Sequence, residues 1–96
     1  MKNYVGKTIA ANCIVGLESL GGKISFEDTH MTFNSHKLNV QKSTIKIEYS
    51  QISKIEKSNT LGIIPNGLKI TTKDNQEYKF VINSRSKIIE FLNTKI

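Results

Sequence analysis

Apolar and polar residues alternate in short runs along most of the chain. In the first run, over residues 7–19, every second position is apolar: Ile9, Ala11, Cys13, Val15 and Leu17. A period of two is typical of a half-buried β-strand. Six more runs with this period lie near residues 24–26, 31–33, 45–49, 55–58, 68–72 and 78–82. The pattern therefore predicts seven short strands.

Turn signals separate several of these runs. Two glycines at residues 21–22 predict a turn between the first two strands, and Asp-Asn at 74–75 predicts a tight hairpin between the last two. Pro-Asn-Gly at 65–67 predicts a turn before the sixth strand. Ile52 and Ile55 are three positions apart, so the alternation slips there, which predicts a bend or bulge.

The period changes near the C-terminus. Ser84 is a suitable N-cap, and it precedes an apolar stripe with three- and four-residue spacing, formed by Ile88, Ile89, Phe91, Leu92 and Ile96. We expect an amphipathic helix from about Ser84 to Lys95. A helix this short persists only when it is packed, so the fold class is mainly β: an antiparallel sandwich or open barrel with the helix covering one end.

Length and composition describe one ordinary globular domain. The chain has 96 residues, of which 38% are hydrophobic and 23% charged, so we treat residues 1–96 as a single domain. No window holds the roughly 18 apolar residues of a membrane span, and the first residues lack an apolar signal-peptide core. We expect a cytoplasmic protein, with any membrane contact being peripheral.

Several segments resemble the bacterial GRAM domains. They are residues 21–24, 31–33, 35–39, 45–52, 59–68 and 77–81, and the most specific is NTLGIIPNGL at 59–68. The resemblance implies a pleckstrin-homology-like fold of two nearly orthogonal antiparallel sheets, seven strands in all, with a helix plugging the open corner. Eukaryotic members of this wider fold class often bind phosphoinositides, other anionic membrane lipids or protein partners, and they are not enzymes. The resemblance therefore implies a non-enzymatic interaction module.

The residues that carry chemistry form no catalytic or metal-binding motif in the sequence. Cys13 has the apolar parity of its strand, which favours a small buried residue. His30 and His36 are six positions apart without a third ligand at zinc spacing, and no glycine-rich phosphate loop is present. We therefore predict no catalytic residue, metal or cofactor. Aromatic residues at core positions weigh against nucleic-acid binding.

The positive charge is unevenly distributed. The net charge is +6, yet residues 1–34 are neutral, whereas 35–57 hold five lysines against Glu48 and Glu56. Lys37, Lys42 and Lys46 are therefore the candidate anionic-surface residues, each contributing about 1 kcal/mol near an acidic leaflet. The alternative interpretation is a solvated loop whose lysines maintain solubility.

The block at 59–67 is unusually apolar for a connection between strands. Leu61, Ile63 and Ile64 either fold beneath the sheet and close the core, or form an exposed tip that contacts a partner. The second case corresponds to an alternative function, a protein–protein or self-association domain without lipid binding. That domain would use this loop or an exposed strand edge, and a homodimer is one form of it.

Overall fold

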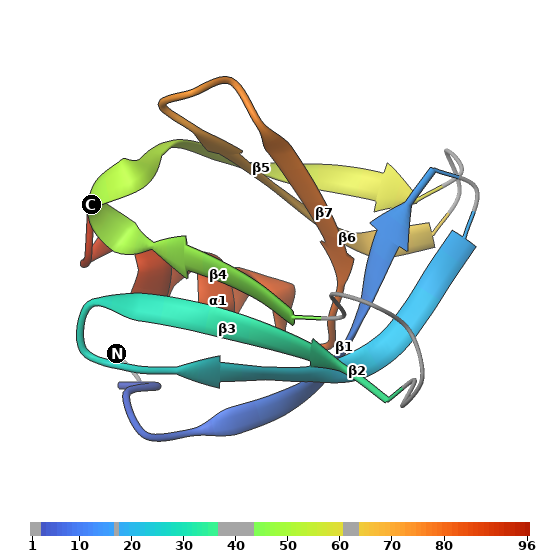
Figure 1. The fold of residues 1–96 in the computed structure, drawn as a ribbon, viewed down its shortest axis with the longest axis horizontal. Helices are drawn as coiled ribbons and strands as arrows, with labels where there is room; N and C mark the ends of the chain where they lie inside the picture. The colour runs from blue at the N-terminus through green and yellow to red at the C-terminus, as the bar shows by residue number, and fades with distance from the viewer. Residues whose placement is uncertain (1–2, 17, 37–43, 61–63) are drawn as a thin grey trace.

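Seven antiparallel strands and one C-terminal helix form the described part of the protein (Figure 1). The computed structural model describes residues 3–16, 18–36, 44–60 and 64–96, without the side chains of 59, 60 and 64–66. The elements are β1 (Thr8–Val15), β2 (Glu18–Phe26), β3 (His30–Ser35), β4 (Thr44–Glu48), the 3₁₀ helix η1 (Tyr49–Gln51), β5 (Ile52–Thr60), β6 (Ile64–Thr72), β7 (Glu77–Val81) and α1 (Arg85–Asn93). The predicted mainly-β class is confirmed.

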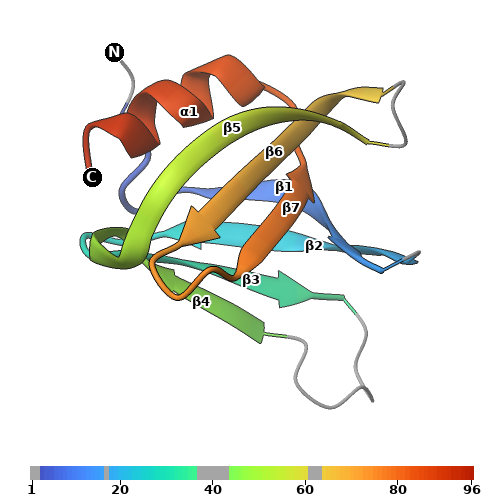
Figure 2. The same ribbon diagram turned by 90° about the horizontal axis from the view of Figure 1, so that it is seen from above.

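The strands form one continuous sheet in the order β4-β3-β2-β1-β7-β6-β5. β1 pairs with β2 along its whole length and with β7 through Asn12–Ile14 only. The sheet bends at this junction, so β1–β4 and β5–β7 form two layers that cross (Figure 2). The two predicted sheets are therefore the two halves of one bent sheet.

The core lies between the two layers, and its residues have the predicted parity. Ile24, Phe26, Met31, Phe33 and Ile47 come from the first layer, and Leu68, Ile70 and Phe80 come from the second; all are buried. Because every second side chain of a strand points to the same face, the alternation in the sequence is enough to identify these positions.

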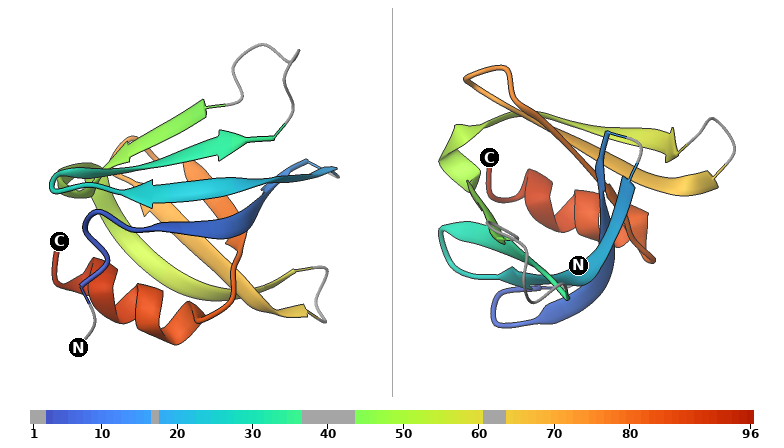
Figure 3. Two further views of the ribbon diagram at one scale, coloured as in Figure 1. Left: turned by 90° about the horizontal axis from the view of Figure 1, so that it is seen from below. Right: turned by 45° about the vertical axis from the view of Figure 1, so that its right-hand side comes forward.

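Helix α1 closes one end of the barrel (Figure 3). Its residues Ile88, Phe91 and Leu92 are buried, and the Phe91 ring lies 5.4 Å from the Phe26 ring and 5.5 Å from the Tyr4 ring, centroid to centroid. The predicted plug is confirmed, except that Ile96 lies beyond the helix and is exposed. Among the described residues, no helix is long and apolar enough to cross a membrane.

The start of α1 is fixed by Arg85. Its Nη1 donates to the carbonyl oxygens of Ser58 on β5 and Gly67 on β6, both at 3.2 Å. Ser84 precedes the helix as predicted, but its backbone is left-handed (φ 60°) and its side chain makes no capping hydrogen bond. Ser84 is therefore the N-cap residue, as predicted, but its hydroxyl does not cap the helix.

The turn predicted at residues 21–22 is also wrong. Both glycines lie inside β2, and the β1–β2 turn contains Gly16, whose φ is 61°. Gly22 faces Ala11 on β1 and Ser35 on β3, and a Cβ at this position would collide with the Asn34 carbonyl oxygen. This glycine is required for the close approach of two strands, not for a turn.

The turn predicted at residues 65–67 is replaced by strand. β6 already begins at Ile64 and pairs there with Thr60 of β5. Pairing with β7 begins only at Gly67, so Pro65 lies where the ladder to β7 is absent, and its missing N–H is tolerated. Two other expectations are confirmed: the β5–β6 register shifts between Ile52 and Lys54, and Asn75 (φ 67°) lies in the β6–β7 turn.

Candidate functional site

The strand order leaves β4 and β5 as the two edges of the sheet. β5 is an irregular edge, because its register against β6 shifts twice along its length. β4 pairs with β3 in one unbroken register from His30↔Glu48 to Asn34↔Thr44. The regular edge β4 is therefore the better template for another strand.

The hydrogen bonds of β4 show which of its backbone groups face the free edge. The Tyr49 N–H donates to the Thr29 carbonyl oxygen at 3.0 Å, so these two residues form a hydrogen-bonded pair at the end of the β3–β4 ladder. Hydrogen-bonded and non-hydrogen-bonded pairs alternate along antiparallel strands. Ile45 and Ile47 consequently bond to β3, while Thr44 and Lys46 direct their N–H and C=O groups outward. Glu48 directs only its N–H outward, because its carbonyl oxygen, at the N-cap of η1, accepts the first hydrogen bond of that helix.

The side chains of β4 divide into an inner and an outer set. Ile47 is buried and Ile45 half-buried on the inner face, whereas Thr44, Lys46 and Glu48 are exposed on the outer face. Neither Lys46 nor Glu48 forms an ion pair with any residue that the structure describes. The edge thus presents one free cation and one free anion, two positions apart.

A shallow hollow of about 220 Å³ lies beside this edge. We call it the edge hollow; it is lined by Lys46, Ile47, Glu48, Gln51, Thr72, Asp74 and Tyr78. One wall is β4 with η1, and the other comes from the end of β6, the following turn and the first part of β7. These walls are held together by the Lys73 N–H, which donates to the Gln51 carbonyl oxygen at 2.8 Å.

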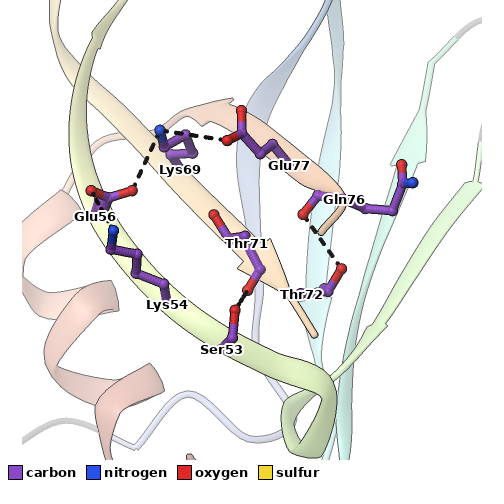
Figure 4. A network of polar contacts seen from close by, with 8 residues as sticks. All are labelled: Ser53, Lys54, Glu56, Lys69, Thr71, Thr72, Gln76 and Glu77. Carbon is purple, nitrogen blue, oxygen red and sulfur yellow. Dashed lines mark hydrogen bonds and ion pairs between the residues drawn. The ribbon is translucent and has the colours of Figure 1, made fainter. Parts of the chain in front are cut away.

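The β6–β7 turn is a rigid wall of the edge hollow. The Thr72 hydroxyl donates to Asp74 Oδ1, and the Thr72 N–H donates to the Gln76 carbonyl oxygen at 2.9 Å; Figure 4 shows Thr72 and Gln76 facing each other. The Thr72 hydroxyl holds the pKa of Asp74 below its ordinary value. Asp74 is therefore an anion at neutral pH and a poor proton donor.

Two further titratable groups are held neutral by burial. Burial raises the pKa of Tyr49 to about 12, helped by the negative charges of Glu27 and Asp28, and its hydroxyl donates to the Glu27 carbonyl oxygen at 2.9 Å. Burial also raises the pKa of the Cys13 thiol. The Cys13 thiol therefore lacks the reactivity of a lowered-pKa thiolate, in line with the predicted structural role.

The outer face of β5–β7 carries a ladder of ion pairs. Glu56 forms ion pairs with Lys54 at 3.6 Å and with Lys69 at 3.4 Å, and Lys69 Nζ lies 3.8 Å from Glu77 Oε2 (Figure 4). Two of the lysines behind the +6 net charge are therefore balanced locally. Exposed pairs of this kind contribute little stability, but they leave less free positive charge on this face.

The predicted site residues are only partly described. Lys37, Lys42, Leu61 and Ile63 lie outside the described residues, and Ile64 is described as the first backbone position of β6, without its side chain. Lys46 lies exposed on β4, beside Glu48 and Asp74 in the edge hollow. Whether residues 59–67 contact a partner stays a prediction, as does the lysine set.

The sequence did not identify the remaining residues of the edge hollow. Glu48 lies two residues after Lys46, and this spacing alone predicts that both side chains point to the same outer face of the strand. Thr72, Asp74 and Tyr78 come from a hairpin more than 20 residues further along the chain. Nothing local in the sequence places that hairpin beside β4.

Comparisons with known proteins support the fold and add no function. No protein-family model matches the chain, and no curated protein matches it. Among solved structures, the C-terminal domain of an unknown protein from Leishmania infantum is similar, with a TM-score of 0.79 and 17% sequence identity. The match covers 95% of this chain and 82% of that one. This likeness shows a shared fold, and the resemblance to GRAM domains stays a prediction.

Proposed function

We propose that this protein is a non-enzymatic interaction module that binds an extended strand of a protein partner along the free edge of β4. The observation that carries the proposal is the row of outward-facing backbone groups at Thr44, Lys46 and Glu48, in a strand without bulges. Strand addition takes its affinity from main-chain hydrogen bonds and its specificity from side chains at alternate positions. Here those side chains are Lys46 and Glu48.

The charges of the edge hollow favour a peptide over a membrane surface. Lys46 shares the hollow with Glu48 and Asp74, so this part of the candidate lysine set is not an isolated cation cluster. An acidic leaflet would meet two carboxylates together with one ammonium group. Peripheral binding to anionic lipid would therefore depend on Lys37 and Lys42, and vesicle flotation tests it separately from peptide binding.

The test removes one outward N–H without disturbing the ladder to β3. Glu48 has φ −81° and ψ 135°, which proline accepts, and its N–H faces the free edge. Glu48→Pro should fold normally and lose the peptides that the parent selects from a phage-displayed random library. Glu48→Gln removes the same charge but retains the N–H, so it should still bind them.

Three results would contradict the proposal. Peptide binding that Glu48→Pro retains at full strength would place the contact elsewhere, and a library that yields no binder would leave the edge without an interaction partner. Salt-sensitive flotation with phosphatidylserine vesicles, absent with phosphatidylcholine vesicles and unaffected by Glu48→Pro, would support the membrane function instead.

A further inference from the structure

The edge of β4 is complementary to itself. We infer that the strand it binds is β4 of a second copy of this chain, so that two barrels join through an antiparallel β4–β4 pair. This inference rests on the proposed function of the same edge and names its partner. The supporting observations are the direction of the backbone groups and the order of charges along the strand.

The backbone restricts the registers that two β4 strands can form. Only residues with an N–H or C=O group that faces outward can form hydrogen bonds across the new junction. One register that meets this condition sets Lys46 opposite Lys46 of the second copy, which is repulsive. Another sets Lys46 opposite Glu48 of the second copy and Glu48 opposite its Lys46, with the two-fold axis at Ile47.

The Lys46–Glu48 register gives favourable side-chain pairs on both faces of the sheet. On the outer face it creates two opposite-charge pairs from groups that have no ion pair among the described residues. On the inner face it sets Ile47 against Ile47 of the second copy, and the paired segment covers residues 46–48 because η1 begins at Tyr49. In each Lys46–Glu48 pair the Glu48 N–H would donate to the Lys46 carbonyl oxygen of the other copy.

The other edge of the sheet is less suited to self-pairing. β5 has two register shifts, which interrupt the spacing of outward groups that a second strand needs. Its Lys54 and Glu56 are already engaged with each other, and Glu56 also binds Lys69. The free charges and the regular backbone coincide at β4 alone among the two edges that the structure describes.

The dimer should be weak and dependent on concentration. β4 has five residues, so the new interface is small and belongs with transient contacts. Each copy also carries a net charge of +6, and the resulting long-range repulsion is screened at about 0.15 M ionic strength, where the Debye length is about 8 Å. Charges directly opposite across a strand pair lie closer than that and are screened less.

Charge exchange tests this register directly. Sedimentation velocity between about 10 µM and 1 mM would compare the parent with Lys46→Glu, Glu48→Lys and the doubly exchanged variant. Each single exchange sets like charges opposite each other twice and should weaken the dimer by roughly tenfold or more. The double exchange restores both pairs with opposite polarity, and its dimer should form within about threefold of the parent's.

Lys23→Glu is the matched control. Lys23 is exposed on β2, away from either edge, and its substitution changes the net charge by the same amount as Lys46→Glu. Its dimerisation should equal the parent's within about twofold. Circular dichroism would verify that every variant is folded.

Three outcomes would overturn the self-pairing. They are a parent that stays monomeric up to 1 mM, single exchanges that dimerise like the parent, and a double exchange that remains as weak as the single ones. A monomeric parent whose selected peptides are lost in Glu48→Pro would refute self-pairing but leave the proposed function intact. Failure of both experiments would remove the edge as a binding site.

Discussion

The helix plug can be tested by truncating Phe91. This side chain is 2% exposed, and its ring contacts three aromatic neighbours, with Phe26, Tyr4 and Tyr49 at centroid distances of 5.4, 5.5 and 6.3 Å. Two of the three come from the strand layer and η1, and Tyr4 comes from the segment before β1. Phe91→Ala would therefore open a cavity where the helix meets the barrel.

The expected loss follows from this burial. Fully buried Phe→Ala substitutions cost about 3–5 kcal/mol in total, and with three aromatic neighbours we expect about 4 kcal/mol or more at Phe91. A chain of this length is stable by roughly 5–14 kcal/mol. A loss of about 4 kcal/mol would remove about 30% of the free energy of unfolding at the upper end of this range and about 80% at the lower end.

Urea denaturation followed by circular dichroism measures this loss. With a slope of about 1–2 kcal/mol/M, the midpoint should fall by roughly 2–4 M. Lys87→Ala is the control, because Lys87 is exposed on the same helix and should change stability by less than about 0.5 kcal/mol. A loss below about 1 kcal/mol at both Phe91→Ala and Leu92→Ala, with unchanged slope, would show that α1 does not seal the core.

Three shorter predictions concern other contacts of the fold. Arg85→Lys should cost about 1–2 kcal/mol in urea denaturation, because the shorter lysine side chain does not reach the position from which Nη1 donates to both Ser58 and Gly67. An equal stability would contradict that role. Gly22→Ala should lower the melting temperature by roughly 10 °C or more, since its Cβ would collide with the β3 backbone; a change of a degree or two would refute the close approach. Ultraviolet absorbance should give Tyr49 a pKa of about 12. Because this pKa is higher in the folded chain than in the unfolded chain, the free energy of unfolding should fall as the pH rises from about 10 to 12. The fall should be less steep in Tyr49→Phe, which has no phenol at this position.

The elements that local sequence determines were predicted well. Alternation assigned the inward positions of the strands, because the side chains of a strand point to opposite faces whatever its neighbours are. The helical stripe likewise assigned Ile88, Phe91 and Leu92 to the core. The slip between Ile52 and Ile55 became a register shift, because the period of two cannot change without an extra residue in the ladder.

The glycine signals were misread for a physical reason. Glycine serves either a positive φ or the close approach of another backbone, and the sequence alone does not separate these uses. Gly16 has the positive φ and lies in the turn, whereas Gly22 and Gly67 lie in strands against the backbones of Asn34 and Ser58. The neighbouring strand decides between them, and that neighbour is fixed only in the folded sheet.

The candidate site depends even more on tertiary structure. The outward parity of Lys46 and Glu48 is local, but their position on an edge strand follows from the strand order, which alternation does not specify. The far wall of the edge hollow comes from residues 72–78, brought to η1 by the bond between Lys73 and Gln51. Sequence reasoning therefore found one lysine of this site and not the surface to which it belongs.

A lysine in the middle of an edge strand usually prevents edge-to-edge association, because pairing would bury its charge without a partner. At β4 the effect is selective, since Glu48 follows Lys46 on the same outer face. An incoming antiparallel strand is accepted when it offers an acid opposite Lys46 and a base opposite Glu48, and strands with other charges leave at least one group unpaired. β4 itself has that order of charges, so the lysine that repels foreign strands becomes an attractive contact with a second copy.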